Sequence, residues 1–488
     1  MPQQQALIIG GGLGGLATAL RLSSRGWSVT VCEAGPKVGG KLNHWSQDGF
    51  VFDTGPSLIT IPRVFDELFA EAGSSLKEQV QLIPLNPLAD YVYPDGTCLT
   101  YSTDLPELSG AIRQLDKRDV DGLNRFMELG KHIFNLSDVT FFRRPPFDPP
   151  SIDTLKALKH FPILHAWGKY HKTVTSFFHN PYLQQLYDRY PTYVGSSPYR
   201  SPATLNVIPY MELTYGGWYV RGGLYCIIEA LVKMLEQAGA TIICDAAVQK
   251  IEHATQRVRR VHLSSGESID ADIIVMNGDP SYTPILLGEA QALPLEKKKR
   301  SMSGFVLLLG IGRTLPTLKH HTIYFSGDYE YEFKQLFEDR CFPDDPTVYV
   351  NIASRSDSSV TPQGGETLFL MANAPANDTI WDDARIEAAR RAVFKRLKSS
   401  GFPDIQDDIR VSEVWTPTRI AQRYNMPGGA IYGTHSHGWR SAFMRPPNKD
   451  RRYEGLYYVG GSTHPGGGTP TVVMSSRITC DLIERFEC

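Results

Sequence analysis

Gly10-Gly11-Gly12-Leu13-Gly14-Gly15 is the most informative stretch of this chain, and Glu33 follows eighteen residues after its last glycine. Residues 6–9, just before the glycines, form an apolar run that predicts a buried strand. Residues 14–25 predict a helix, and residues 28–32 predict a second strand that ends at Glu33. A glycine-rich turn between strand and helix, with an acid after the next strand, is the pattern of a dinucleotide-binding βαβ unit.

Each glycine of this pattern, and the acid that follows it, has its own physical role. Gly10 permits the tight turn, Gly12 lets the backbone approach a pyrophosphate, and Gly15 allows close packing of helix on strand. The pyrophosphate is expected at the helix N-terminus, where unpaired N–H groups and the helix dipole favour negative charge. Glu33 can accept hydrogen bonds from both ribose hydroxyls and would repel a 2′-phosphate. A glycine-rich turn that holds no ligand is the alternative interpretation.

A second set of glycines favours FAD over NAD. Gly39-Gly40-Lys41 and Phe52-Asp53-Thr54-Gly55-Pro56-Ser57 follow the second predicted strand. A nicotinamide domain does not need them, whereas FAD bound lengthwise gains a close backbone and a cation beside its pyrophosphate. At this point the chain resembles the superfamily of flavin amine oxidases and carotenoid desaturases. Lys41 stands where arginine is common in that superfamily, which keeps the charge but gives up bidentate geometry.

The C-terminal sequence narrows the resemblance. Residues 443–450 (FMRPPNKD) lead into residues 456–470 (LYYVGGSTHPGGGTP). This is similar to the bacterial and fungal phytoene desaturases, including diapocarotene and hydroxycarotenoid desaturases, in which such a loop passes the flavin and opens a helix. The segment 216–223 (GGWYVRGG) matches the same group, except that Val220 replaces the usual proline. Thr469 replaces the commoner Val or Ile, which points to a subgroup other than the standard phytoene enzymes.

The resemblance implies an α/β fold with a Rossmann-like FAD-binding domain of the glutathione-reductase/amine-oxidase type. A mixed-sheet substrate domain and a helical, membrane-associating insertion are expected beside it. The FAD-binding domain should be discontinuous and include residues 1–75, 221–290 and 411–488. The substrate domain should include residues 76–220 and 291–410, with the insertion at about 105–200.

Local patterns predict further elements of the FAD-binding domain. These are a helix from Gly222-Gly223 to Gly239, a strand over 240–248, a hairpin over 250–253 and 258–263, and a strand over 273–276.

The glycine-rich pattern with Glu33 and the resemblance together give a set of expected FAD contacts. The set comprises Gly10, Gly12, Leu13, Gly14, Gly15, Glu33, Gly40, Lys41, Leu42, Gly55, Pro56, Ser57, Val248, Asp279, Gly461, Gly468, Thr469 and Pro470.

Composition sets outer limits on the function. A formal net charge of −2 gives no reason to expect a nucleic-acid partner. Seven scattered cysteines without a Cys-x-x-Cys pair indicate neither a zinc site nor a disulfide framework, so a reducing compartment is expected. We find no signal peptide and no uncharged apolar run near the roughly 18 residues of a membrane span. We therefore expect a cytoplasmic protein, and the resemblance implies that it is peripherally associated with the membrane.

One segment of the insertion is amphipathic. Six lysines or arginines and two aspartates lie between residues 143 and 172. Apolar residues recur at helical spacing on the other face, namely Ile152, Leu155, Leu158, Phe161 and Leu164, with Trp167 after them. This pattern fits an interfacial surface on anionic lipid, and it fits equally an ordinary helix packed on its own domain. The resemblance favours the membrane, because a carotenoid substrate dissolves there.

Desaturation removes a hydride and a proton from adjacent carbons of a polyene. No side chain accepts a hydride, so flavin N5 is the expected acceptor, and oxygen or a quinone would then reoxidise the flavin. The protein must align an allylic carbon and exclude water. Expected wall residues of such a tunnel are Tyr210, Tyr215, Trp218, Tyr219 and the strand Phe305–Leu309, although core packing is the commoner role of such residues.

No catalytic base is assigned from the sequence. His464 and Glu212 are the candidates, and the alternatives are loop shaping for His464 and an ordinary structural role for Glu212. His435 and His437 lack a carboxylate or thiolate at ligand spacing, so no metal is expected.

Several other functions use similar architectures. A carotenoid isomerase, saturase or terminal oxidase is the nearest alternative, and a flavin amine oxidase is a more distant one. A non-enzymatic isoprenoid-binding protein of the GDP-dissociation-inhibitor type is the third. The complete glycine loop with Glu33 argues against it. The sequence leaves open the carotenoid, the number of desaturation steps and the oligomeric state.

Overall fold

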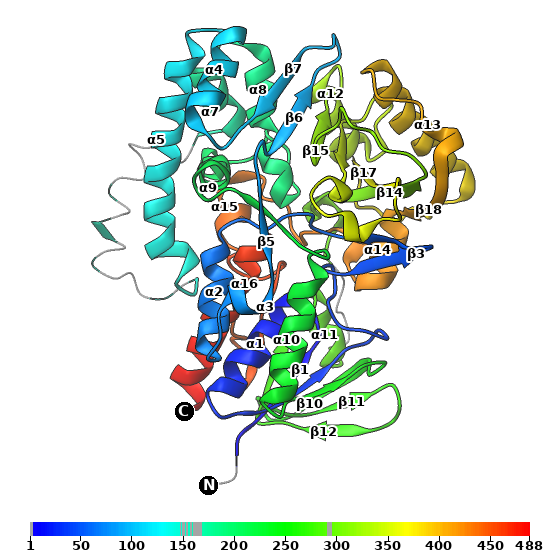
Figure 1. Ribbon diagram of the computed structural model, residues 1–488. Coiled ribbons are helices and arrows are strands. Elements are labelled where there is room, and N and C mark those ends of the chain that lie inside the picture. The colour runs from blue at the N-terminus through cyan, green and yellow to red at the C-terminus, as the bar shows by residue number, and fades with distance from the viewer. Residues whose placement is uncertain are drawn as a thin grey trace.

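Two large β-sheets and a group of helices organise the molecule (Figure 1). The computed structural model describes residues 3–146, 168–289 and 295–488, together with Asp148, Ile152, Leu155, Lys156 and Lys159.

The first sheet is five-stranded and wholly parallel, with the order β19-β13-β1-β2-β9. Its strands come from distant parts of the chain: β1 (Gln5–Ile9), β2 (Ser28–Cys32), β9 (Thr241–Ile243), β13 (Ile273–Met276) and β19 (Leu456–Tyr458). A parallel sheet must be covered on both faces. Ala6 and Ile8 pack against the helices α1 (Leu13–Ser24), α10 (Tyr225–Gln237) and α16 (Thr469–Glu487). Leu7 and Ile9 face the small sheet of β10 (Val248–Ala254), β11 (Arg257–Leu263) and β12 (Ser268–Asp270).

The predicted strand over 240–248 is wrong in its second half. β9 ends at Ile243, and the chain then bends through Asp245, which has a φ of +54°. Backbone hydrogen bonds from Asp245 N to Gly35 O and from Ala246 N to Glu33 O hold this bend. Alternating hydrophobicity could not reveal it, because the bend depends on partners from a different βαβ unit.

The second sheet is seven-stranded and mixed. Its order is β18-β14-β17-β16-β15-β6-β7, and β6 runs parallel to β15 whereas the other neighbours are antiparallel. The strands are β6 (Ala89–Val92), β7 (Cys98–Tyr101), β14 (Ser303–Ile311), β15 (His321–Tyr324), β16 (Val348–Asn351), β17 (Glu366–Ala374) and β18 (Ile409–Trp415). α13 (Asp383–Ser399) packs on one face of it. The pairing of β18 places residues 411–415 in this sheet rather than with the parallel strands.

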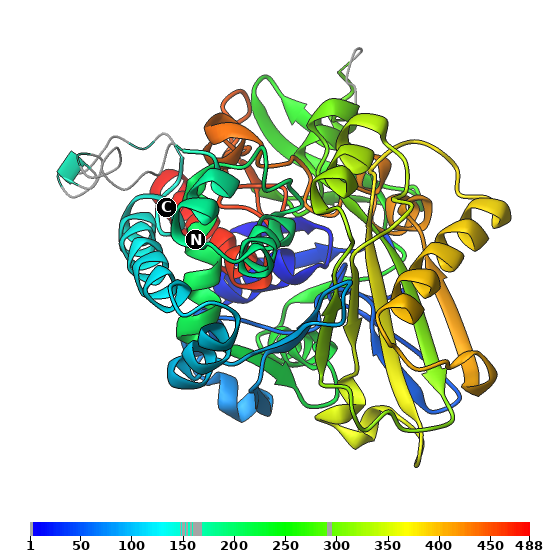
Figure 2. The same cartoon turned by 90° about the horizontal axis from the view of Figure 1, so that it is seen from above.

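Helices form the third part of the molecule. They are α4 (Leu105–Leu115), α5 (Asp119–Ser137), α7 (Tyr170–Phe177), α8 (Pro181–Asp188) and α9 (Val207–Tyr215). Seen from above, α5 and the seven-stranded sheet lie on opposite sides of the molecule (Figure 2), and the parallel sheet lies below them in Figure 1. Shorter elements connect these parts, namely β3 (His44–Gln47), β4 (Phe50–Asp53), α2 (Pro62–Glu71), α3 (Leu76–Gln79), β5 (Leu82–Leu85), β8 (Gly217–Val220), α11 (Thr283–Leu286), α12 (Tyr329–Lys334), α14 (Pro417–Tyr424) and α15 (Gly438–Phe443).

The amphipathic segment predicted over 152–167 lies largely outside the described residues. Ile152 and Leu155 are described, and both are exposed. Among the described residues, no helix is long and apolar enough to cross a membrane.

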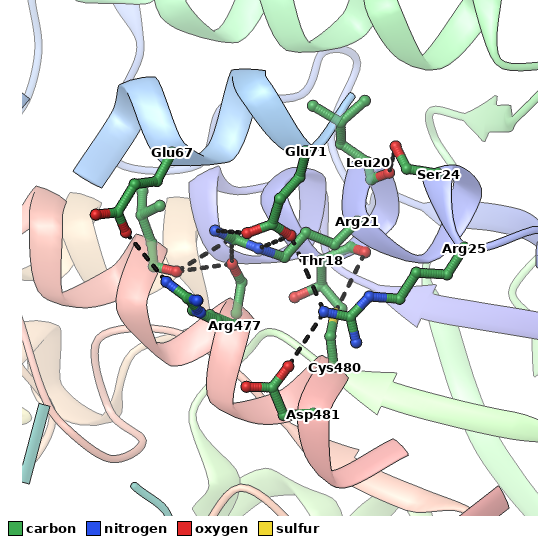
Figure 3. A network of polar contacts seen from close by, with 12 residues as sticks. Thr18, Leu20, Arg21, Ser24, Arg25, Glu67, Glu71, Arg477, Cys480 and Asp481 are labelled. Atoms are coloured by element: carbon green, nitrogen blue, oxygen red, sulfur yellow. Dashed lines mark hydrogen bonds and ion pairs between the residues drawn. The ribbon is translucent and has the colours of Figure 1, made fainter. Parts of the chain in front are cut away.

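Hydrogen bonds and ion pairs of two arginines join α1 to α2 and α16 (Figure 3). The Arg21 side chain is 2% exposed and forms an ion pair with Glu71 at 3.0 Å, and it also donates to Ser476 and to the carbonyl of Val473. Arg25, one turn later and nearer to solvent, pairs with Asp481 at 3.1 Å and Glu484 at 3.0 Å. These contacts fix the helix whose first turn carries the glycine loop.

This difference in burial predicts different stabilities for two matched variants. Arg21→Met should lower the free energy of unfolding by about 2 kcal/mol, because it removes the charged hydrogen bonds that a buried guanidinium makes to the partly exposed Glu71 and to Ser476. Arg25→Met should cost less than about 1 kcal/mol, since its partners are exposed. Urea denaturation of both variants measures the difference, and equal losses would contradict the role assigned to Arg21.

Candidate active site

A cavity of about 740 Å³ lies where the two large sheets and the helices meet. The glycine loop, the second glycine pair and the segment 460–472 line one part of it. Residues of β14, β17 and α9 line another part. Every residue that the sequence predicted as an FAD contact lines this cavity except Gly15.

The glycine loop is too tightly packed for side chains. A Cβ on Gly15 would lie 2.3 Å from the carbonyl oxygen of Gly10, because Gly15 packs against the end of β1 and does not line the cavity. A Cβ on Gly14 would lie 2.7 Å from Asn277 Oδ1. Asn277 follows β13, and its Nδ2 donates to the carbonyl of Gly10 at 2.9 Å. Asn277 therefore fixes the loop, a role that the sequence analysis did not assign.

Glu33 lies at the end of β2 with its carboxylate held by backbone. Oε2 accepts from Gly11 N and Oε1 from Gly35 N, each at 2.8 Å. Each carboxylate oxygen keeps a further lone pair for another donor. Glu33 lines the cavity, so that capacity is available to a ligand there.

Two helices begin at the cavity without a side-chain cap. Gly12 is the N-cap residue of α1 and Gly468 that of α16, and neither helix has an acidic residue in its first turn. Their first N–H groups and the positive ends of both helix dipoles are therefore left for an anion.

Two cations, the half-buried Lys41 and the buried Arg445, add positive charge to the same cavity. Burial lowers the pKa of Lys41 to about 8 and that of Arg445 to about 10, and the carboxylate of Asp279 partly offsets both shifts. Lys41 donates to the carbonyl of Ile431, and Arg445 donates to the carbonyl of Tyr432. Neither cation has a carboxylate within ion-pair distance among the described residues. Two cations beside one aspartate leave an excess of positive charge.

The two candidate bases occupy different environments. The buried ring of His464 does not line the cavity, and its Nε2 donates to the carbonyls of Phe141 and Arg144. Burial lowers its pKa to about 4. His464 thus connects the C-terminal loop to the residues that follow α5. Glu212 does line the cavity, and it accepts hydrogen bonds from Tyr190 at 2.7 Å and from Tyr193 at 2.8 Å.

Most of the predicted tunnel residues do not reach the cavity. Tyr210 and Tyr215 pack against Phe134 with ring centroids 5.7 Å apart. Trp218 and Tyr219 lie in β8 and do not line the cavity. Of the predicted strand 305–309, Val306 alone lines the cavity. The period-2 alternation of β14 turns Phe305, Leu307 and Leu309 toward α13, and Leu308, on the same face as Val306, packs in the cluster of Phe50 and Phe52 instead. Other apolar lining residues are Leu58, Leu88, Phe141, Ile208, Met211, Phe369, Met371, Trp415 and Ile431.

His435 and His437 stack with ring centroids 4.0 Å apart. His435 Nε2 donates to the carbonyl of Lys298, and His437 Nε2 accepts from Ser197 N. Within the described part of the chain, no group of three or more His, Cys, Asp or Glu is placed to hold a metal ion.

The model of the family of flavin containing amine oxidoreductases matches residues 13–483. A 1-hydroxycarotenoid 3,4-desaturase of Flavobacterium sp. (strain P99-3) is 34% identical, over 98% of this chain and 99% of the relative. The chain belongs to this flavin-dependent family and, within it, to the carotenoid desaturases. It is therefore an FAD-dependent oxidoreductase.

Other relatives of this oxidoreductase carry different names. A 4,4′-diapolycopene oxygenase of Methylomonas sp. is 32% identical, over 98% of both chains. A 4,4′-diaponeurosporene oxygenase of Staphylococcus aureus (strain Mu50 / ATCC 700699) is 31% identical, over 99% of this chain and 98% of the relative. Among solved structures, an oxidoreductase from Methanosarcina mazei aligns with a TM-score of 0.67 at 17% identity, covering 99% of this chain and 100% of that one. That likeness shows the fold.

The cavity of this flavin-dependent oxidoreductase fits FAD. Two uncapped helix N-termini and the two cations that line the cavity suit a diphosphate, and Glu33 has capacity for ribose hydroxyls. The chemistry of the donors thus agrees with the cofactor of the family.

Proposed function

We propose that this enzyme desaturates an acyclic carotenoid. The observation that carries the proposal is the continuity of one cavity from the glycine loop to the apolar walls of β14, β17 and α9. A long polyene needs an apolar enclosure next to the redox group, and the full-length relatives are named for carotenoid chemistry.

Bound FAD would supply the hydride acceptor. The loop of Gly12 and Gly14, the carboxylate of Glu33, and the cations Lys41 and Arg445 would hold it. The other predicted contacts, among them Gly40, Leu42, Gly55, Pro56, Ser57, Val248, Asp279, Gly461, Thr469 and Pro470, would complete its surroundings.

The apolar walls would orient the substrate and exclude water. Val306, Phe369 and Met371 line the cavity side by side on paired strands and would hold the polyene by contact alone. We assign no residue to proton removal, because the delocalised cation left after hydride loss is strongly acidic and needs no strong base. Oxygen or a membrane quinone would accept the electrons.

Oxidation of a terminal methyl group is the second candidate. It is favoured by the two relatives named as oxygenases, which match this chain over almost its full length. Both reactions would use the same cavity, and their products differ in whether oxygen is gained.

Expression in cells that accumulate phytoene, diapophytoene or hydroxyneurosporene tests these alternatives. Desaturation predicts a product with a longer chromophore and two hydrogens fewer, seen by chromatography with mass detection. A product that gains oxygen would favour oxidation of the end group. Unchanged pigments, despite protein that carries FAD, would contradict the proposal.

We propose further that the enzyme binds the membrane surface through the insertion. Exposed apolar residues there include Val139, Ile152 and Leu155, and the basic sequence around them suits anionic headgroups. The protein should sediment with anionic liposomes at low salt, and should not do so with liposomes of neutral lipid. Absence of lipid-dependent sedimentation would refute membrane binding.

The affinity for FAD should depend on pH through Lys41. Its pKa of about 8 means that the side chain is charged below pH 8 and loses its proton as pH rises through that value. The dissociation constant for FAD should therefore rise by about tenfold between pH 7 and 9. Lys41→Arg stays charged and should show little change. Quenching of flavin fluorescence measures both, and parallel pH profiles would contradict this role of Lys41.

A further inference from the structure

A cluster of polar side chains interrupts the apolar part of the cavity. We call Tyr91, Arg189, Tyr193 and Glu212 the Arg189 cluster, and all four line the cavity. Tyr91 comes from β6, Arg189 and Tyr193 from the turns after α8, and Glu212 from α9. Separate parts of the fold therefore converge on one polar point.

Hydrogen bonds connect the cluster. Arg189 Nη1 donates to the phenol oxygens of Tyr193 at 3.0 Å and Tyr91 at 3.2 Å. The hydroxyl of Tyr193 donates in turn to Glu212 at 2.8 Å. The guanidinium also lies 5.0 Å from the ring centre of Tyr193 and 6.0 Å from that of Tyr349.

The donor capacity of Arg189 is only partly used. Within residues 3–146, 168–289 and 295–488, no acceptor is bonded to Nε or Nη2, and no carboxylate forms an ion pair with Arg189. An arginine has five N–H donors in a fixed fork. Several donors at the cavity wall therefore remain for a ligand.

Such a cluster is costly in a cavity that holds only hydrocarbon. Removing a guanidinium from water carries a penalty of several kcal/mol unless its donors are satisfied. A polyene without oxygen satisfies none of them. Glu212 balances the charge of Arg189, so the cluster as a whole suits a neutral group better than an anion.

We propose that the Arg189 cluster binds a neutral oxygen at the end of the polyene substrate, either a hydroxyl or an aldehyde carbonyl. This inference rests on the proposed function, since it specifies the substrate of the same cavity. Arg189 would donate to the ligand oxygen, and Glu212 would accept from a ligand hydroxyl. Tyr349, whose ring centre lies 6.0 Å from the Arg189 guanidinium, shares a hydrogen bond with Ser57, one of the expected FAD contacts. An end group held by the cluster would therefore leave the adjoining carbons near those contacts.

The test compares two acyclic carotenoids that differ by one hydroxyl group, 1-hydroxyneurosporene and neurosporene. Dissociation constants are measured with FAD-loaded enzyme by quenching of protein fluorescence, and turnover is followed separately. Wild-type enzyme should bind the hydroxylated compound more tightly. Arg189→Met should reduce this preference by at least about tenfold, the effect of losing a charged hydrogen bond.

Two further variants complete the test. Arg391→Met is the matched control, because Arg391 is exposed on α13 and pairs only with Glu387 among the described residues. It should leave both dissociation constants unchanged. Tyr193→Phe keeps the ring, removes the link between Arg189 and Glu212, and should cause a smaller loss of preference. If Arg189→Met does not retain FAD, the loss of preference is measured with Tyr193→Phe instead.

The outcomes separate this inference from the proposed function. A selective loss of affinity for the hydroxylated compound supports the inference. Equal binding of both compounds by wild type, or equal weakening of both in Arg189→Met, overturns it. If wild type prefers the hydroxylated compound but converts neither, the proposed reaction fails while the binding site stands.

Discussion

Gly15→Ala is expected to yield protein that purifies almost without flavin. The added Cβ would lie 2.3 Å from Gly10 O and 2.9 Å from Asn277 Nδ2, the two atoms whose hydrogen bond fixes the glycine loop. Helix α1 must then move away from β1, and its N-terminus leaves the position from which it faces the cavity. The ratio of flavin to protein absorbance should fall at least about tenfold.

Gly110→Ala is the matched control for this substitution. Gly110 lies within α4, and an added Cβ there meets nothing within 4 Å. Alanine also has the higher helix propensity, so this variant should keep its flavin and its stability. Retention of flavin by Gly15→Ala would contradict the role given to the close contact of helix and strand.

Arg445→Met is expected to weaken FAD binding by about 10- to 150-fold, the range for a lost hydrogen bond to a charged group. Arg445 is buried, lines the cavity and has no ion-pair partner among the described residues, so its charge is available to an anionic cofactor. Titration of apoprotein with FAD, followed by fluorescence, measures the dissociation constant.

Arg445→Lys separates charge from geometry. Lysine keeps the positive charge but cannot reproduce the three contacts of the guanidinium, to the carbonyls of Tyr432 and Gly461 and to Ser436. We expect an affinity between those of wild type and Arg445→Met. An unchanged affinity in Arg445→Met would show that this cation does not serve the cofactor.

The cofactor side of the cavity was predictable because its signals are local. The glycine run, the strand after it and Glu33 lie within one short stretch, and their spacing is set by backbone geometry. The C-terminal loop was found through its resemblance to a family rather than through any periodicity. Both sets of residues line the same cavity in the structure.

The substrate side was less predictable because it is assembled from distant segments. Aromatic residues near Glu212 suggested a wall, yet Tyr210 and Tyr215 pack on Phe134 within the helices. Which face of β14 meets the cavity depends on α13 covering the other face, and α13 follows more than seventy residues later. Asn277 directly follows the predicted strand 273–276. Ligands of parallel sheets bind at the carboxyl ends of the strands, and this position was the one signal in the sequence for the role of Asn277.

Arg189 gave no such signal. It follows an ordinary amphipathic helix, and its phenol partners come from β6 and from the following turn. Only the tertiary structure brings its donors to the cavity, so sequence patterns could not separate it from a surface arginine.

The most direct test of the account is anaerobic mixing of FAD-loaded enzyme with an acyclic carotenoid while the whole visible spectrum is recorded. Desaturation by hydride transfer predicts that the flavin bands bleach as the polyene bands shift to longer wavelength, with one flavin reduced for each new double bond. A longer polyene formed without flavin bleaching, or an unreactive mixture for every carotenoid tested, would contradict it.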